Sequence, residues 1–201
     1  VFADGSVMNH TDALGKDSAG FDISRLLVGS EGTLALITSV QLQLQDALPR
    51  DRVTSLVGVP TLSDAVATVA GAGERSDLLA AEYMDTTGME LVCDVAHLPH
   101  PLQDRWPYYV LIETVGEPRL PDTADAAVDR RLWVYRERQP EAAATFGVVH
   151  SLDVALPLKN LDDVVDHLPR LVHPHRAFTF GHLAEGNLHI QVIGPPALDD
   201  R

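Results

Sequence analysis

Hydrophobic and polar residues alternate near the start of the chain, and longer apolar blocks follow. Within residues 34–44, Val40, Leu42 and Leu44 alternate with glutamines, and this period of two predicts a β-strand. The next stretch, residues 46–52, is polar and contains Pro49, which is typical of a linker. We therefore place a boundary here, with one domain over residues 1–48 and a second over residues 49–201.

The second domain alternates strand-sized with helix-sized blocks. β-Branched and aromatic runs predict strands at 53–59, 78–84, 108–115 and 148–156. Helical periodicity predicts helices from Thr61 or Ser63 to Gly73 and at 86–95, 122–144 and 161–171. This order predicts an α+β fold with helices on one side of a mainly antiparallel sheet. Only residues 116–121 join the strand ending at Val115 to the next helix, so the connection is compact or residues are absent there.

The first domain begins and ends with turn signals. Asp4-Gly5 is typical of a hairpin turn, and the chain opens on Val1 inside an apparent strand. We therefore expect the sequence to be part of a longer protein. A polar loop at residues 16–20 precedes a short predicted helix at 21–27 and a turn containing Gly29 and Gly32.

Composition narrows the classes of partner. The formal net charge of −14 makes nucleic acid and anionic membranes poor candidates, and 45% hydrophobic with 22% charged residues is typical of a globular protein. Cys93 is the one cysteine and lies in an apolar helical stretch, so we expect it to be buried, in a reducing cytoplasm. No apolar run has the length of a transmembrane segment.

Two histidines flank a tight connection near the end of the sequence. Residues 177–183 and 188–193 predict two strands, joined by Ala-Glu-Gly-Asn. If Leu183 pairs with Leu188, His182 lies directly opposite His189, with Cβ atoms roughly 5 Å apart. Two imidazoles in this register can bind one metal ion or one anionic group, and Gln191 follows on the same face. The alternative is a pair of histidines without a chemical role.

A second block of interest is Asp22-Ile23-Ser24-Arg25-Leu26-Leu27-Val28-Gly29-Ser30-Glu31-Gly32-Thr33-Leu34. It predicts a helix, a turn with two glycines and then a strand. Glycines allow close backbone approach, and the exposed N–H groups beside them suit an anion.

These two blocks and two further motifs resemble those of a flavoenzyme family, and they occur in the same order. Residues 16–22, 27–34 and 37–38 resemble the end of the PCMH-type FAD-binding domain of the FAD-linked oxidases, the relatives of vanillyl-alcohol oxidase. Residues 181–189 resemble the Gly-His-x-x-x-Gly-Asn-x-His motif of the family's ferredoxin-like cap domain. Residues 132–137 are similar to its Leu-Trp-x-x-Arg-Glu helix, and residues 153–157 to its Asp-Val-x-Leu-Pro strand.

The resemblance implies a role for each matching residue. In the D-2-hydroxyglutarate and D-lactate dehydrogenase branch, the residues matching His182 and His189 ligate a divalent metal, usually zinc, that holds the substrate. Arg136 would bind a substrate carboxylate, with Asn187 and Gln191 as further substrate contacts. The residues that would line FAD are Gly29, Ser30, Glu31, Gly32, Thr33, Leu34 and Ile37.

The implied activity is oxidation of a D-2-hydroxy acid to the 2-oxo acid. A metal lowers the pKa of the bound hydroxyl, a histidine takes its proton, and FAD takes the hydride. His182, His189 and Arg136 are therefore the expected catalytic residues. The resemblance leaves the electron acceptor unidentified and allows a homodimer.

The sequence also departs from the family. The upstream pyrophosphate-binding segment and a later Glu-His-Gly motif that completes the metal site do not occur in it, so we expect this chain to be inactive by itself. Pro140 replaces a threonine that touches substrate, and Ser151 replaces a lysine. The alternatives are a flavin-dependent alcohol or alditol oxidase, a synthase related to alkylglycerone-phosphate synthase, and a non-catalytic metal-binding or interaction domain with relic motifs.

Overall fold

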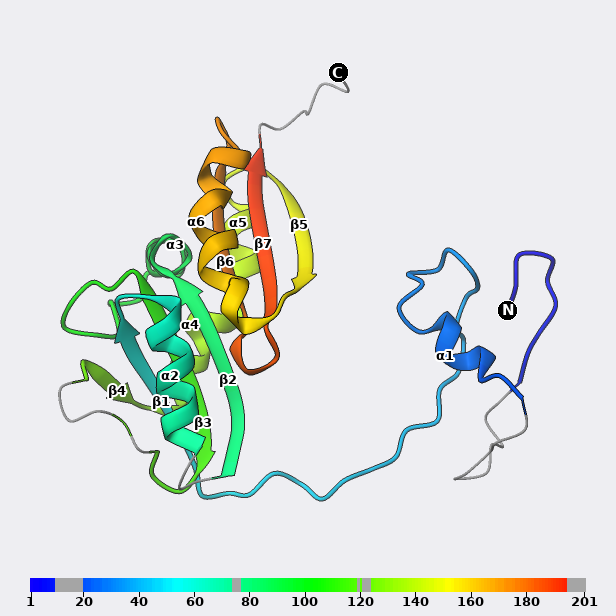
Figure 1. Cartoon of the computed structure of the whole chain (residues 1–201), viewed down its shortest axis with the longest axis horizontal. Helices are drawn as coiled ribbons and strands as arrows, with labels where there is room; N and C mark the ends of the chain where they lie inside the picture. Colours follow the sequence, from blue (N-terminus) through cyan, green and yellow to red (C-terminus); the bar gives the residue numbers. More distant parts are fainter. Residues whose placement is uncertain (10–19, 74–76, 119, 121–123, 195–201) are drawn as a thin grey trace. The chain divides into compact units, whose positions relative to one another are not determined.

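A computed structural model describes residues 1–9, 20–73, 77–118, 120 and 124–194 of the chain. The chain divides into two compact units, Val1–Leu48 and Pro49–Arg201 (Figure 1). Two predictions fall outside the described residues, namely the polar loop at residues 16–18 and the helix start at Asp122.

The first unit contains one short helix, α1 (Ile23–Leu27), among its described residues. Asp22 caps this helix, because its carboxylate accepts a hydrogen bond from the backbone N–H of Arg25 at 3.2 Å. The Asp4-Gly5 turn forms as predicted, with Gly5 N donating to Phe2 O at 3.0 Å, but no strand flanks it.

The strand predicted at residues 34–44 is wrong. These residues have no regular secondary structure, and the alternating side chains of Val40, Leu42 and Leu44 are exposed. Alternation supplies an apolar face, but a strand also needs a neighbour to accept its backbone hydrogen bonds. Val1 exchanges two backbone hydrogen bonds of 2.8 Å with Leu36, but among the described residues of this unit the pairing does not extend into a strand ladder.

The described residues of the second unit form a seven-stranded sheet whose neighbours are all antiparallel, in the order β4-β1-β3-β2-β6-β7-β5. This confirms the predicted α+β class. The strands are β1 (Arg52–Val59), β2 (Asp77–Asp85), β3 (Tyr108–Val115), β4 (Ala126–Val128), β5 (Val148–Ala155), β6 (Arg176–His182) and β7 (Asn187–Gly194).

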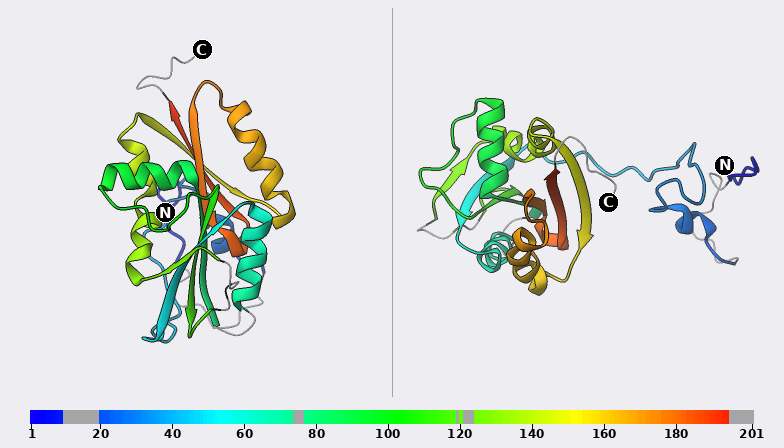
Figure 2. Two further views of the ribbon diagram at one scale, coloured as in Figure 1. Left: turned by 90° about the vertical axis from the view of Figure 1, so that its left-hand side faces the viewer. Right: turned by 90° about the horizontal axis from the view of Figure 1, so that it is seen from above.

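Helices cover both faces of the sheet, so the prediction that they lie on one side is wrong (Figure 2). Successive residues of β3 explain this: Tyr109 and Leu111 pack in one core, whereas Val110 and Ile112 pack in the other. The first core includes residues of α3 (Thr86–Ala96), α4 (Trp133–Glu137) and α5 (Gln139–Ala144). The second includes residues of α2 (Leu62–Gly73) and α6 (Leu161–Leu171).

The helix predicted over residues 122–144 is replaced by several shorter elements. β4 comes first and pairs with β1, and the 3-10 turn η1 (Arg130–Leu132) follows. Asp129 caps this turn, because its carboxylate accepts from Arg131 N at 2.8 Å. Helical structure begins at Trp133, because the preceding residues are held by the edge of the sheet and by this cap.

Two halves of the sheet meet at a short ladder. β2 pairs with β6 through Glu82↔His182, Tyr83↔Gly181 and Met84↔Phe180. Next to it, the carboxylate of Asp85 caps α3 by accepting from Gly88 N at 2.8 Å and accepts from Thr179 N at 2.6 Å. Asp85 thus connects β2, α3 and β6, and desolvation of its carboxylate raises its pKa to about 6.

Candidate active site at one end of the sheet

The connection between β6 and β7 carries the Gly-His-Leu-Ala-Glu-Gly-Asn-Leu-His motif, and close backbone approach explains its glycines. A Cβ atom on Gly181 would overlap the carbonyl oxygen of Asn187. Gly186 has φ 67° and lies against the carbonyl of Leu156. Between them, η3 (Leu183–Glu185) forms one 3-10 turn. The motif therefore builds a compact turn with His182 before it and His189 after it.

The predicted register of the two histidines is wrong by two residues. His189 pairs with Phe180, so His182 is not directly opposite it. Leu183 belongs to η3 and is buried instead of extending the strand, which accounts for the shift. A shift of two keeps both side chains on one face. Their ring centroids are 5.3 Å apart in an edge-to-face arrangement.

Glu82 on β2 lies at the centre of the polar groups around these histidines. Its Oε1 accepts from His182 Nδ1 at 2.6 Å, and its Oε2 accepts from Arg136 Nε at 2.7 Å. The carboxylate is 8% exposed. We refer to Glu82, Arg136, Asp153, His182 and His189 as the sheet-end cluster. Sequence reasoning missed Glu82; its position inside the apolar run of the predicted strand 78–84 was an available signal that the residue is unusual, but it did not indicate the partners.

His189 faces a second carboxylate. Its Nδ1 lies 3.5 Å from Asp153 Oδ1, which also accepts from Asn187 Nδ2 at 2.8 Å. Partial burial lowers the pKa of His189; Asp153 opposes this shift, and Arg136 adds to it. This shift favours the neutral imidazole, which is the form that binds metals.

Arg136 lies in the last turn of α4 and is not the solvated helix residue that its arginine neighbours suggest. Its side chain is 13% exposed, and its Cζ lies 4.5 Å from the centre of the Phe180 ring. This cation–π contact and the ion pair with Glu82 fix the plane of the guanidinium. Nε donates to Glu82, and among the described residues the two Nη groups form no hydrogen bond.

Gln191 and Ser151 lie side by side on the same face as His189. Their positions pair across β5 and β7, and Ser151 Oγ donates to Gln191 Oε1 at 2.8 Å. Gln191 is buried. Pro140 is exposed and lies in the first turn of α5, where proline is compatible with a helix start.

The donor atoms are compatible with a metal ion but do not form a complete site. Each histidine presents its Nδ1 to a carboxylate, which is the usual support of a metal-ligating imidazole and leaves Nε2 as the ligand atom. Within the described part of the chain, no group of three histidine, cysteine or acidic side chains is arranged to hold a metal. His182 and His189 therefore supply two ligands at most, and a catalytic site usually has three.

A cavity of about 400 Å³ borders the sheet-end cluster. It exists because β6 pairs with β2 only at residues 82–84, so the preceding part of β2 has a free edge on that side. The described residues that line it are Leu78, Leu79, Ala80, Ala81, Glu82, His182, Ala184 and Glu185.

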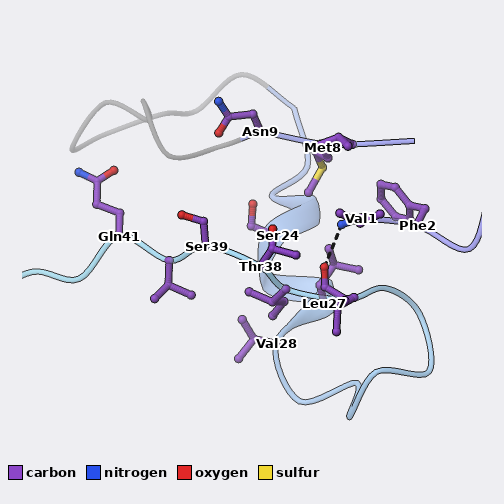
Figure 3. A pocket seen from close by; sticks show the side chains of 14 residues that line it. Val1, Phe2, Met8, Asn9, Ser24, Leu27, Val28, Thr38, Ser39 and Gln41 are labelled. Atoms are coloured by element: carbon purple, nitrogen blue, oxygen red, sulfur yellow. Dashed lines mark hydrogen bonds between the residues drawn. The ribbon is translucent and has the colours of Figure 1, made fainter. Parts of the chain in front are cut away.

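The first unit holds the turn that was predicted to bind FAD. Gly29, Glu31 and Gly32 have positive φ angles, and Thr33 N donates to Ser30 O at 2.9 Å, so a tight turn forms. Within the same unit, a cavity of about 590 Å³ is lined by residues including Leu27, Val28, Ile37 and Thr38 (Figure 3). Val1 and Leu36 also line it, and Val1 N donates to Leu36 O at 2.8 Å.

The second unit, with its antiparallel sheet, is the part of the chain that a known family model matches. The family model of FAD linked oxidases, C-terminal domain, matches residues 48–200. The chain therefore belongs to the FAD-linked oxidase family, as the sequence motifs indicated.

Several curated relatives are similar over nearly the whole chain. It is 33% identical to the mitochondrial D-2-hydroxyglutarate dehydrogenase of Rattus norvegicus and 36% identical to that of Bos taurus, over 96% of this chain and 40% of each relative. It is 28% identical to the D-2-hydroxyglutarate–pyruvate transhydrogenase of Saccharomyces cerevisiae, over 96% of this chain and 46% of that protein. The chain spans about two fifths of the length of the dehydrogenases.

Proposed function

We propose that the protein containing this chain is an FAD-dependent dehydrogenase that oxidises a D-2-hydroxy acid to the 2-oxo acid. One observation carries the proposal: the fold brings Arg136, which lies far from His182 and His189 in the sequence, to the same end of one sheet face as these histidines, around Glu82. The names of the similar dehydrogenases support this reaction class.

Arg136 would bind the carboxylate of the substrate. Glu82 occupies Nε, so the Nη1 and Nη2 groups form the free end of the guanidinium. Two parallel N–H groups match the two oxygens of a carboxylate. Phe180 lies against the guanidinium and limits its rotation, so the bound acid would have a defined orientation.

His182 and His189 would hold a divalent cation, zinc being the first choice for two imidazoles, beside the substrate hydroxyl. The charge of the cluster supports this. Besides the histidines it contains one arginine and two carboxylates, and a bound cation would offset the excess negative charge that an anionic acid would meet. A bound cation would lower the pKa of the hydroxyl.

The flavin, when bound, would accept the hydride from C2 of the substrate. We propose that the first unit contributes to its site through the turn of Gly29, Ser30, Glu31, Gly32, Thr33 and Leu34 and through Ile37. The positive φ angles of Gly29 and Gly32 support close approach of a ligand to this backbone.

Ser151 and Gln191 bear on which acid is the substrate. Ser151 donates to Gln191, so the amide nitrogen of Gln191 is the group left for substrate. We propose Asn187 and Gln191 as further substrate contacts. A shorter acid than D-2-hydroxyglutarate, such as D-lactate, belongs in the same test, because a serine here cannot supply a second cationic contact.

The test is an anaerobic visible spectrum of the full-length protein before and after addition of D-2-hydroxyglutarate, D-lactate and their L-enantiomers. We expect a flavin spectrum that bleaches with a D-acid only. Bleaching by an alditol instead would favour the alcohol-oxidase alternative, and a full-length protein without flavin would favour a non-catalytic domain. Zinc titration of the wild type and of His182→Ala, with His150→Ala as the matched control, tests the metal site.

A further inference from the structure

We propose that Glu82 is a positioning residue that fixes the guanidinium of Arg136 and the imidazole of His182 in one arrangement. One side chain thereby holds both Arg136, which we propose to bind the substrate carboxylate, and His182, which we propose to lie beside the substrate hydroxyl. The inference rests on the proposed function for the roles of Arg136 and His182, and it assigns Glu82 no contact with substrate.

The geometry of the carboxylate carries the first step. Its two oxygens serve different partners, at 2.6 Å to His182 Nδ1 and 2.7 Å to Arg136 Nε. Both distances are typical of charge-assisted hydrogen bonds. The carboxylate is almost fully buried, so neither oxygen has water as a ready substitute for its partner.

The contact with Arg136 decides which end of the guanidinium is free. With Nε–H donated to Glu82, only the end formed by Nη1 and Nη2 can grip a carboxylate. Without this contact the side chain could turn and offer the Nε edge instead. Glu82 thereby sets the direction from which the acid is bound.

The contact with His182 decides which ring nitrogen carries the proton. A carboxylate only accepts hydrogen bonds, so Nδ1 of His182 must be the donor. Nε2 of the neutral ring then carries the lone pair, which is the form that ligates a cation or accepts a proton. Replacing the carboxylate by an amide removes this preference.

The place of Glu82 in the fold explains why one residue can do both. It pairs with His182 in the three-residue ladder between β2 and β6, and α4 brings Arg136 to the same point. Glu82, Arg136 and His182 therefore come from three elements, β2, α4 and β6, and Glu82 is the residue that contacts the other two.

Glu113 provides a matched control on the neighbouring strand β3. Its carboxylate is 9% exposed, and it pairs with Arg52 at 3.2 Å and with Thr54 Oγ1 at 3.3 Å. Glu113 thus has similar burial and an arginine partner, but among the described residues it forms no hydrogen bond with a histidine. Glu113→Gln reproduces the loss of a buried charge without touching the sheet-end cluster.

The experiment compares Glu82→Gln, Glu82→Asp and Glu113→Gln with the wild type in the full-length flavoprotein. The first readout is kcat and KM for the acid that bleaches the flavin. We expect Glu82→Gln to lower kcat/KM roughly 10–100-fold, with both kcat and KM affected, because orientation of the acid and the state of His182 both change. Glu82→Asp, which restores the charge but reaches one partner at a time, should recover part of this loss. Glu113→Gln should keep kcat and KM near their wild-type values, even where it loses as much thermal stability as Glu82→Gln.

The second readout needs neither activity nor metal. Side-chain ¹⁵N spectra of histidine-labelled, metal-depleted protein report the tautomer of each ring, and a His182→Gln spectrum assigns the signal. We expect His182 to be the Nδ1–H tautomer in the wild type and in Glu113→Gln, and a mixture in Glu82→Gln. An unchanged tautomer in Glu82→Gln would overturn the inference, as would equal kinetic losses in Glu82→Gln and Glu113→Gln. A wild type that oxidises no 2-hydroxy acid would overturn the proposed function, while the spectra still decide the role of Glu82.

Discussion

Arg136 illustrates how neighbours, more than sequence position, determine the state of a single side chain. Arg130, Arg131 and Arg138 lie close to it in the sequence, and Arg131 and Arg138 form exposed ion pairs with Asp129 and Glu141. Arg136, in contrast to these exposed pairs, forms an ion pair with the buried carboxylate of Glu82 and lies over the ring of Phe180. Replacing Arg136 therefore removes an ion pair and a ring contact as well as a positive charge.

We expect Arg136→Lys to lower kcat/KM for the D-2-hydroxy acid roughly 10–100-fold. Lysine keeps the charge but lacks the planar pair of donors, and the loss of one hydrogen bond to a charged group costs about 1.5–3 kcal/mol. Steady-state kinetics of the full-length enzyme measure the effect. Arg138→Lys changes an exposed pair on the same segment, and equal losses in both variants would contradict a role for Arg136 in binding substrate.

Individual site residues were predictable to the extent that they occur in sequence motifs. His182, His189 and Arg136 were singled out from the sequence, and the structure brings them together. Glu82 was not, because its role depends on a long-range strand pair that no local pattern encodes. The register error has a similar origin: alternation does not show that Leu183 leaves the strand for a 3-10 turn.

At the scale of elements, strong apolar patterns predicted boundaries well. β3 and α6 have the predicted limits, because each combines a long apolar pattern with polar or proline-rich flanks. β4 was misread as helix, because three residues at a sheet edge carry too little pattern and depend on pairing with β1. The segment at residues 34–44 failed in the opposite way, with a strand pattern and no partner strand.

Asp85, which joins β2, α3 and β6, makes the stability of the fold depend on pH. Its pKa of about 6 in the folded protein lies above the ordinary value of 3.8, so its contribution to stability is present below pH 3.8 and is lost as the pH rises through 6. We expect Asp85→Asn to flatten the dependence of unfolding free energy on pH between these values. The variant should also be less stable throughout, because an amide nitrogen cannot accept from Thr179 N. Urea unfolding at pH 4 and pH 7 measures both effects, and an undiminished difference between the two pH values would contradict the assignment.

At the scale of the whole molecule, both hydrophobic cores belong to the second unit. The buried residues of the two cores all follow residue 55, whereas Ala35 is the buried hydrophobic residue described in the first unit. No helix in the described part of the chain is long and apolar enough to cross a membrane. The cytoplasmic location expected from the single cysteine stays a prediction, and the rat and bovine relatives are named as mitochondrial.

We expect residues 49–201 to fold without residues 1–48. Both cores and the seven-stranded sheet are complete within this segment, so removing the first unit should leave the melting temperature within a few degrees of its value in the whole chain. Circular dichroism during heating measures this. A broad, non-cooperative transition of the 49–201 protein would show that the first unit contributes to its stability.

The sheet-end cluster is built from two consecutive parts of the chain, which meet in the sheet at the short ladder between β2 and β6. Glu82 and Arg136 precede the bend at Phe146 and Gly147, whereas Asp153, His182 and His189 follow it. A recombinant of this chain with a relative, joined at that bend, would therefore take the arginine that we propose to bind the carboxylate from one parent and the histidines that we propose to lie beside the hydroxyl from the other. Its two parents would need to agree at three residue pairs between β2 and β6 and where α3 and α5 pack on β6 and β7, so the bend divides the proposed acid-binding residues at an interface that can be specified in advance.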